Sequence, residues 1–177
     1  MGRSRYRILP DNNTYFATCA VVNWLPIFGR TDLAQIVLDS MKFMHERKRL
    51  VLHAYVLMEN HLHLVGSSEN FSQEMSNLKS FTARSIVDFL TENGPNFFLE
   101  QLKFFRKKHK KDQDYQVWQE GFHPQAILNG TLLNDRIEYI HNSPVKRGYV
   151  ECPEHWRYSS AAQYIGLTGV VPVEILA

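Results

Sequence analysis

The sequence predicts an α+β protein of the ferredoxin-like class, with one antiparallel sheet and helices mainly on one face. Segments rich in aromatic and β-branched residues alternate along the chain with segments whose apolar residues recur every three or four positions. The chain has 177 residues, with no internal repeat and no stretch typical of a linker. We therefore expect a single domain over residues 1–177.

The composition is that of an ordinary globular protein. Hydrophobic residues make up 44% of the chain and charged residues 21%, which excludes wholesale disorder. No apolar run approaches the roughly 18–20 residues that a membrane helix needs. The beginning of the sequence, MGRSRYRILPDNNTYF, has basic residues without an apolar block behind them, so we expect no signal peptide and a cytoplasmic protein. The two cysteines, Cys19 and Cys152, exclude a disulfide scaffold and are expected to be buried or idle thiols.

The first half of the chain is predicted to form a strand, a helix and paired strands. Residues 14–23 (TYFATCAVVN) have strand composition. Thr31 can cap a helix that runs to about Lys48. Residues 51–66 (VLHAYVLMENHLHLVG) are apolar at both parities and interrupted only at Glu59-Asn60. That length suits two strands with a tight turn, or one long bent arm, buried on both faces.

The next segments are predicted to form a helix, an irregular region and a further strand. The helix should cover residues 72–91 and end at Asn93-Gly94-Pro95. Residues 96–114 indicate a short helix followed by an exposed loop, and residues 115–127 a strand region with a bend at Gly121. Most of the buried stripe of the 72–91 helix should come from Met75, Leu78, Phe81, Ile86, Phe89 and Leu90.

A last amphipathic helix precedes the tail. Thr131 or Asn134 is expected to cap it, and Pro144 should end or kink it. The segment HWRYSSAAQYIG is expected to form a short helix or turn packed on the body, with residues 167–177 as an extended end.

Two histidines separated by one residue are the sharpest local feature. In a strand, His61 and His63 point to the same face, and two neighbouring imidazoles can share a divalent cation or bracket an anionic oxygen. The spacing alone also fits two core histidines, because the chain has 8 histidines. Glu59 and Asn60 favour a site, since packing does not require polar groups inside an apolar stretch.

The predicted helix over residues 135–150 carries a second candidate group. Tyr139, Asn142 and Ser143 share one helix face, because they are three and four positions apart. Taken alone, Tyr139 also fits an amphipathic core position. A free tyrosine hydroxyl, with a pKa of about 10, is a poor nucleophile, but a cation at the same phosphate would polarise the P–O bond. The histidine pair and the tyrosine together form a chemically complete set for phosphodiester cleavage.

A local run of positive charge indicates contact with nucleic acid. Residues 103–111 (KFFRKKHKK) contain six cations, one histidine and no acid, whereas the whole chain has a formal net charge of only +2. Such a block is typical of nucleic-acid contacts and also compatible with a solvated loop. Lys146 and Arg147 add two cations after the tyrosine, where a phosphate backbone could lie.

Four ordered blocks of the sequence resemble a known family. YVLMENHLHLV resembles the His–hydrophobe–His (HUH) motif of single-tyrosine transposases. WQEGFHPQAI, RIEYIHNSPVKRGYV and HWRYSSAAQY resemble three later blocks of the same family, in order and in approximate spacing. The blocks span about residues 53–165 and look most like the REP-associated tyrosine transposases, a branch related to the transposases of the smallest insertion sequences.

The resemblance implies a transposase or single-strand endonuclease that cleaves and rejoins single-stranded or hairpin DNA, as a monomer or homodimer. It implies that Tyr139 keeps a 5′-phosphotyrosine link, and that His61 and His63 hold a divalent metal, Mg²⁺ or Mn²⁺. The third ligand would come from Ser143, where relatives commonly carry asparagine, or from Asn142. Basic side chains expected to contact DNA are Lys79, Arg84, Arg106, Lys107, Lys108, Lys110, Lys111, Lys146 and Arg147. Candidates for stacking on bases are Trp118, Phe122 and Trp156, of which Trp118 fits the core better.

Two departures from the family pattern leave other functions open. Ser143 also fits a non-catalytic, domesticated DNA-binding protein of the same fold, and the acidic Glu59 replaces a common proline. A metal-dependent phosphoesterase that uses water in place of Tyr139 is a third possibility. With DNA as the partner, we expect a nucleoid-associated protein in the cytoplasm.

Overall fold

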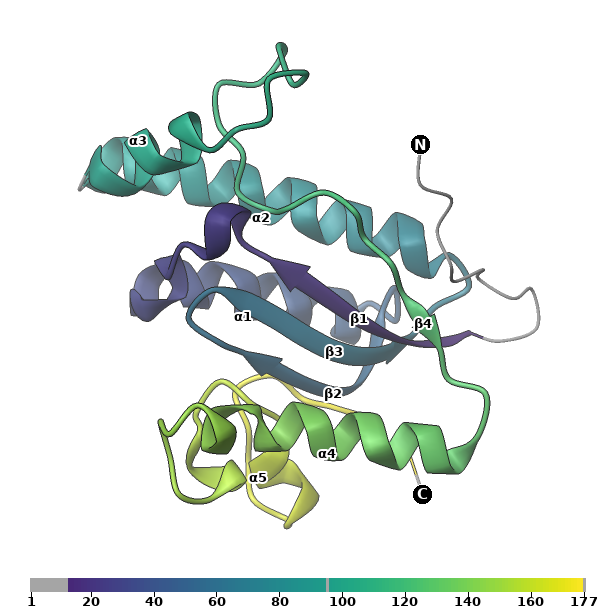
Figure 1. Cartoon of the computed structure of the whole chain (residues 1–177). Helices are drawn as coiled ribbons and strands as arrows, with labels where there is room; N and C mark the ends of the chain where they lie inside the picture. The colour runs from purple at the N-terminus through teal and green to yellow at the C-terminus, as the bar shows by residue number, and fades with distance from the viewer. Residues whose placement is uncertain (1–12, 95, 177) are drawn as a thin grey trace.

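The computed structural model describes residues 13–94 and 96–176, and within them one antiparallel sheet lies at the centre (Figure 1). The strand order is β2-β3-β1-β4. The strands are β1 (Thr14–Ala20), β2 (Val51–Leu57), β3 (His61–Ser67) and β4 (Gln125–Ala126). Residues 51–66 thus form two strands joined by a tight turn, one of the two predicted arrangements.

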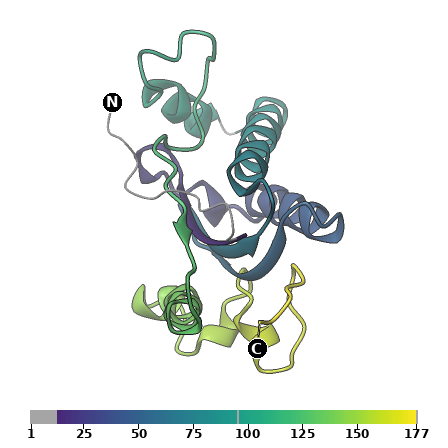
Figure 2. The same cartoon turned by 90° about the vertical axis from the view of Figure 1, so that its right-hand side faces the viewer.

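Helices cover both faces of this sheet. They are α1 (Thr31–Glu46), α2 (Phe71–Asn93), α3 (Asn96–Phe104), α4 (Gly130–Lys146) and α5 (Ala161–Tyr164), with short 3-10 turns η1 (Val22–Trp24), η2 (Ile27–Gly29) and η3 (Pro153–His155). Figures 1 and 2 show α1, α2 and α3 on one side of the sheet and α4 and α5 on the other. The predicted α+β class and antiparallel sheet are confirmed, with three of the five described helices on the main face. None of the helices in the described ranges combines the length and the apolar character needed to cross a bilayer.

Strand β1 separates two hydrophobic clusters by simple alternation. Tyr15, Ala17 and Cys19 are buried in the larger cluster, with α1 and α2. Phe16 points the other way, into a smaller cluster with residues of α4. Cys19 is a free thiol whose pKa burial raises to about 11, which keeps it protonated.

Strand β3 is buried on both faces, as predicted for residues 51–66. Leu62 and Leu64 belong to the larger cluster under α1 and α2. The alternation therefore directs His61 and His63 to the face that α4 covers. The strand thus anchors its two polar side chains through two leucines on the opposite face.

The buried stripe of α2 differs from the prediction at one position. Phe81 is 62% exposed, so the prediction that it belongs to the buried stripe was wrong. Thr82 is fully buried instead, and its hydroxyl accepts a hydrogen bond from Trp118 Nε1 at 3.0 Å. A buried indole needs an acceptor for its N–H, and a phenylalanine cannot supply one. The helix ends at Gly94 with φ of +47°, as the glycine predicted, while Pro95 lies outside the described residues.

The strand predicted over residues 115–127 is mostly irregular. Only Gln125–Ala126 pairs as a strand, with an isolated bridge between Trp118 and Val21. Gly121 takes φ of +86°, and Pro124 has no N–H to donate, so the segment cannot continue a ladder. It follows the edge of β1 as an irregular strap.

Both predicted helix caps were wrong. Thr31 is the first helical residue of α1 and not its cap. Asn129 caps α4, where its Oδ1 accepts a hydrogen bond from the Leu132 N–H at 2.9 Å, so neither Thr131 nor Asn134 does so. Helix α4 also continues past Pro144 to Lys146, which places the proline in its last turn.

The segment HWRYSSAAQYIG packs on the body as expected, because the Ser160 N–H donates to the Tyr55 carbonyl at 3.0 Å. The extended end that follows it also packs on β2. The Val171 N–H donates to the Tyr55 hydroxyl at 3.1 Å, and the Glu174 N–H donates to the Leu52 carbonyl at 2.8 Å. Both partners lie on β2, so the extended end covers the strand that closes that edge of the sheet. Ala177 lies outside the described residues.

Candidate active site

The two histidines of β3 lie side by side on the α4 face of the sheet. His63 pairs across the strands with Thr18 on β1, and His61 pairs with Ala20. The two imidazole centroids are 4.5 Å apart, and both side chains are buried. The i, i+2 spacing thus brings the rings together as predicted.

Each ring is held at one nitrogen by a neighbouring polar side chain. His61 Nδ1 lies 2.6 Å from Asn60 Oδ1, and His63 Nδ1 lies 2.8 Å from Thr18 Oγ1. The Asn60 oxygen can only accept, so His61 carries its proton on Nδ1 and keeps the Nε2 lone pair. Such hydrogen bonds orient metal-binding imidazoles and fix their tautomer.

Burial keeps both imidazoles neutral. It lowers the pKa of His61 to about 4, against an opposing effect of the Glu59 carboxylate. It lowers the pKa of His63 to about 3, with a further contribution from His61. Neutral rings have lone pairs to offer a cation at physiological pH.

Tyr139 on α4 reaches the histidine pair within the same chain. Its ring centroid lies 5.2 Å from that of His63, and the side chain is 40% exposed. Phe16 on β1 adjoins both rings, 5.7 Å from His63 and 6.0 Å from Tyr139. Of the two readings of Tyr139, the exposure fits a reactive group better than a core residue. Phe16 and Thr18 were missed in the sequence, although their i, i+2 spacing on a strand was the available signal.

The residues expected to supply a third metal ligand lie one turn after the tyrosine. The Ser143 hydroxyl donates to the Tyr139 carbonyl at 2.7 Å, and the Asn142 amide donates to the Glu138 carbonyl at 3.0 Å. Both oxygens still have lone pairs. Two neutral imidazoles fit a divalent metal, whereas no histidine, cysteine or carboxylate of the described residues joins them as a close third ligand.

An ion pair connects the histidine turn to the end of α4. Glu59 Oε1 lies 3.0 Å from an Arg147 guanidinium nitrogen. Glu59 Oε2 is buried, and no residue within 13–94 and 96–176 forms a hydrogen bond with it. Partial burial, and secondly the Glu59 carboxylate, raise the pKa of Tyr149. Lys146 Nζ lies 5.7 Å from the Tyr139 ring centroid. Of the two cations expected to contact DNA here, one therefore faces the tyrosine and the other a carboxylate.

The basic block lies across the sheet from the tyrosine. Figures 1 and 2 show the loop after α3 projecting from the side opposite α4. Lys107, His109 and Lys110 surround the Glu120 carboxylate at 3.2, 3.0 and 3.3 Å. The His109 hydrogen bond, and then those of the two lysines, lower the pKa of Glu120 to about 2. The positive charge of the block is therefore partly compensated.

The other cations of the block differ in their contacts. Arg106 donates to the Lys110 carbonyl at 3.1 Å and also to the Gln113 carbonyl, so it holds the loop together. Within the described part of the chain, Lys108 and Lys111 form no ion pair.

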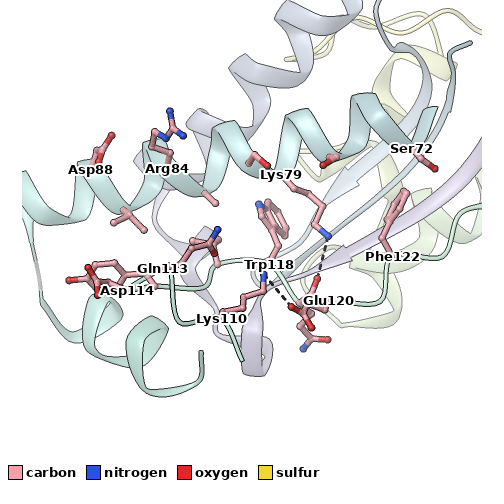
Figure 3. A pocket seen from close by; sticks show the side chains of 17 residues that line it. Ser72, Lys79, Arg84, Asp88, Lys110, Gln113, Asp114, Trp118, Glu120 and Phe122 are labelled. Atoms are coloured by element: carbon pink, nitrogen blue, oxygen red, sulfur yellow. Dashed lines mark hydrogen bonds and ion pairs between the residues drawn. The ribbon is translucent and has the colours of Figure 1, made fainter. Parts of the chain in front are cut away.

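A groove of about 740 Å³ runs between α2 and residues 110–122, which include the first part of the strap (Figure 3). Lys79 and Arg84 line it. Lys79 Nζ donates to the Gln119 carbonyl at 3.3 Å and lies 5.6 Å from the Phe122 ring centroid. Trp118 is 5% exposed and packs in the core, as predicted. The groove is separate from the histidine–tyrosine cluster.

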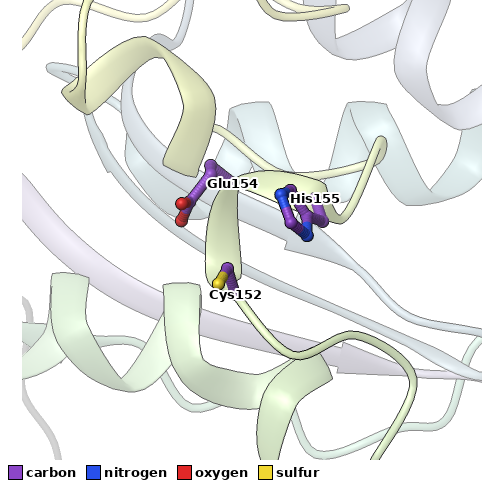
Figure 4. A group of neighbouring side chains, drawn as sticks. All are labelled: Cys152, Glu154 and His155. Atoms are coloured by element: carbon purple, nitrogen blue, oxygen red, sulfur yellow. The ribbon is translucent and has the colours of Figure 1, made fainter.

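A second group of metal-type ligands lies on η3. Cys152, Glu154 and His155 hold their ligand atoms within 4.8 Å of one another (Figure 4). This group was not predicted from the sequence, where its signal is the C-x-E-H run of residues 152–155. The nearby Trp156, a stacking candidate, instead donates to the Leu57 carbonyl at 3.0 Å and stacks on Tyr149.

Comparison with known proteins agrees with the resemblance seen in the sequence. A Haemophilus influenzae protein named as a REP-associated tyrosine transposase is 26% identical over 111 residues, which are 60% of this chain and 56% of that protein. A solved structure of a REP-associated tyrosine transposase bound to a REP hairpin superposes with a TM-score of 0.67, at 19% identity, covering 99% of this chain and 94% of the other. This chain resembles the REP-associated tyrosine transposases in sequence and in fold. The chain thus spans just over half the length of the H. influenzae relative, and no protein-family model matches it.

The candidate site therefore lies in a chain that has the fold of the REP-associated tyrosine transposase in that solved structure. The superposition extends over nearly the whole chain, so it covers β1, β3 and α4, the three elements that carry the histidine–tyrosine cluster. The likeness of fold does not depend on the identity of single side chains.

Proposed function

We propose that this protein is a DNA transposase that cleaves and rejoins single-stranded or hairpin-bearing DNA through Tyr139, as a single domain acting on the nucleoid. The observation that carries the proposal is the 5.2 Å between the Tyr139 and His63 rings, which come from a helix and a strand of one chain. An accessible phenol beside two neutral, oriented imidazoles is a rare combination outside a reactive site. The relatives named above favour DNA as the substrate.

The reaction requires one bond to form and one to break. The Tyr139 oxygen attacks a backbone phosphorus, and the bond between that phosphorus and the 3′-oxygen breaks. The phenol proton goes to solvent, and the leaving 3′-oxygen takes up a proton from solvent. A 5′-phosphotyrosine and a free 3′-hydroxyl result, so rejoining needs no external energy source.

His61 and His63 would hold a divalent cation, Mg²⁺ or Mn²⁺, whose chemistry here is to polarise the P–O bond and offset developing charge. Asn60 and Thr18 keep the two rings in place for this role, through their hydrogen bonds to the Nδ1 atoms. Ser143 or Asn142, both half-buried on α4, would complete the ligand set.

DNA would contact the molecule at more than one surface. Lys146 is close enough to the Tyr139 ring to meet the backbone beside the cleaved bond. Other basic side chains would contact DNA away from that bond, because they lie on the α2 face: Lys79, Arg84, Arg106, Lys107, Lys108, Lys110 and Lys111. Arg147 would contact DNA only by leaving Glu59.

The decisive experiment is covalent capture of DNA. Incubation with hairpin-bearing single-stranded DNA and Mg²⁺ or Mn²⁺ should give a protein–DNA adduct that survives denaturation. Tyr139→Phe should abolish it, because only the attacking oxygen is removed. Tyr149→Phe is the matched control, since Tyr149 is comparably exposed at the end of the same segment and should still form the adduct.

Other outcomes would identify the other functions. DNA binding without an adduct in the wild type would indicate the non-catalytic binding protein. The observation that favours this alternative is the hydrogen bond that the Ser143 hydroxyl donates to a helix carbonyl, because it makes Ser143 a weaker metal ligand. Cleavage that survives Tyr139→Phe and disappears in His63→Ala would indicate a phosphoesterase that uses water. An adduct formed by Tyr139→Phe would refute the assigned nucleophile.

A metal titration must separate two ligand groups. Calorimetry with Mn²⁺ should therefore use Cys152→Ser combined with His155→Gln, which removes two of the three ligands on η3. Binding that persists in this variant and is lost on His61→Ala belongs to the β3 pair.

A further inference from the structure

Arg136 lies one turn before the tyrosine and reaches the same aromatic cluster. It is three positions from Tyr139 on α4, so the two side chains share a helix face. Its guanidinium carbon lies 5.0 Å from the Phe16 ring centroid, and the Phe16 ring adjoins both Tyr139 and His63. Arg136 was not among the expected site residues.

Among the residues that the structure describes, the charge of Arg136 has no counter-ion. Its Nε is buried and makes no hydrogen bond, and no carboxylate in residues 13–94 and 96–176 pairs with it. Three other arginines in the described ranges pair with acids: Arg30 with Asp32, Arg49 with Glu74 and Arg147 with Glu59. Arg106 also has a buried Nε without a partner among the described residues, but its guanidinium donates to two carbonyls. A half-buried guanidinium without an anion costs free energy, which a bound anion would offset.

We propose that Arg136 forms a phosphate-binding position beside Tyr139 and holds a non-bridging oxygen of the DNA backbone. The inference deepens the proposed function and rests on it for the identity of the ligand. A guanidinium matches a phosphate because its planar donors can bind two oxygens at once. The guanidinium carbon lies 5.0 Å from the Phe16 ring centroid, a cation–π contact that favours this position of the side chain.

The position gives Arg136 a role in the step as well as in binding. Negative charge accumulates on the non-bridging oxygens as the Tyr139 oxygen attacks and before the 3′-oxygen leaves. A fixed donor beside that phosphorus stabilises the transition state more than the bound DNA.

The test compares Arg136→Gln, Arg136→Lys and Arg47→Gln. Arg47 is the matched control, because its guanidinium lies 5.2 Å from the Phe43 ring centroid, at the end of α1 on the opposite side of the sheet. In single-turnover adduct formation at saturating DNA, Arg136→Gln should be slower by roughly 10²–10³-fold. Arg136→Lys should lie between, since it keeps the charge and loses the planar fork. Arg47→Gln should match the wild type.

Two further readouts separate phosphate contact from a structural role. Substituting sulfur for one non-bridging oxygen at the cleaved phosphate should slow the wild type, and that slowing should largely vanish in Arg136→Gln. The slope of log affinity for single-stranded DNA against log salt should also fall by about 0.7 in Arg136→Gln, because one phosphate contact is lost. Circular dichroism checks that each variant is folded.

The outcomes distinguish this inference from the proposed function. If the wild type forms no adduct, the transposase proposal fails, and the salt slope alone decides whether Arg136 contacts phosphate. An unchanged salt slope in folded Arg136→Gln overturns the inference. An adduct rate and sulfur effect equal to those of the wild type overturn it as well.

Discussion

The two faces of the sheet both carry cations and aromatic rings, but they differ in how the positive side chains are paired with carboxylates. On the α2 face, Lys107, His109 and Lys110 converge on the single carboxylate of Glu120. On the α4 face, Arg136 has no counter-ion among the described residues, and two imidazoles stay neutral beside an exposed phenol. The cations of the α2 face are thus partly compensated by Glu120, whereas on the α4 face Arg147 pairs with Glu59 and Arg136 pairs with no carboxylate of the described residues.

The difference teaches that charge density in the sequence is a poor guide to the reactive site. The six cations of residues 103–111 are the strongest electrostatic signal in the chain, yet part of their charge is used within the protein. Arg136 on α4, by contrast, gives no signal in the sequence. Its guanidinium is paired with no carboxylate of the described residues, so a bound anion would stabilise it. We therefore assign the chemistry to the α4 face and an auxiliary role in binding to the α2 face.

Removing the proposed metal ligands should give the largest difference between the faces. We expect His61→Ala or His63→Ala to lower the rate of adduct formation by roughly 10³-fold or more, because a metal at the phosphate contributes several kcal/mol to the transition state. Lys79→Gln, on the α2 face, should lower it less than about tenfold. Single-turnover assays with Mn²⁺ measure both. Equal losses on the two faces would contradict the division of roles.

Acid should destabilise the α4 face more than the opposite face, where burial also lowers the pKa of His45 on α1. Burial lowers the folded-state pKa of His61 to about 4, of His63 to about 3 and of His141 to about 4. In the unfolded chain these histidines titrate near pH 6.5, so below that pH the unfolded state binds more protons and stability falls. Their contribution is fully present above about pH 6.5 and lost as the pH falls toward 4.

The expected slope is about 1.4 kcal/mol of unfolding free energy per pH unit for each of the three rings near pH 5. Urea unfolding between pH 7 and 4.5 measures it, and His63→Gln should remove one ring's share. Amide exchange at pH 5 should show opening first around β3 and α4. A flat profile over this range would mean that the rings are solvated and not buried.

The start of α4 gives a smaller test of how the tyrosine is positioned. Asn129→Ala should lower the unfolding free energy by about 1 kcal/mol, because it removes the side-chain acceptor of the Leu132 N–H. Thr131→Ala and Asn134→Ala should change it by less than about 0.5 kcal/mol, since neither residue caps the helix. Chemical denaturation of the three variants compares them directly.

The sequence predicted what depends on local periodicity. The helices α1 and α2, the paired strands and the shared face of His61 and His63 all follow from spacing of 3.6 or 2 residues. It was wrong where tertiary contacts decide. Thr82 is buried because the Trp118 indole needs a hydrogen-bond acceptor. The sequence of α2 alone does not indicate that Trp118 packs against it.

The candidate site was predicted in part for the same reason. The histidines and Tyr139 could be found as chemistry-bearing types at telling spacings, with help from the family resemblance. The i, i+2 spacing of Phe16 and Thr18 places them on one strand face, but only the pairing of β1 with β3 brings them to the histidines. Arg136 could not be found, because it enters the site through the packing of α4 on the sheet. The roles of Tyr139, the histidines and the DNA-contacting cations remain predictions for the experiments above.

The smallest expected effect concerns the compensated face. Glu120→Gln removes the carboxylate that Lys107, His109 and Lys110 share, so their charge becomes available to phosphates. We expect affinity for single-stranded DNA to rise two- to fivefold (about 0.4–1 kcal/mol) at low salt, with a steeper salt dependence and an unchanged rate of adduct formation at saturating DNA. Fluorescence anisotropy across a salt series measures the first two. If Glu120→Gln instead accelerates the chemical step, the loop reaches the cleaved phosphate, and the two faces are parts of one site.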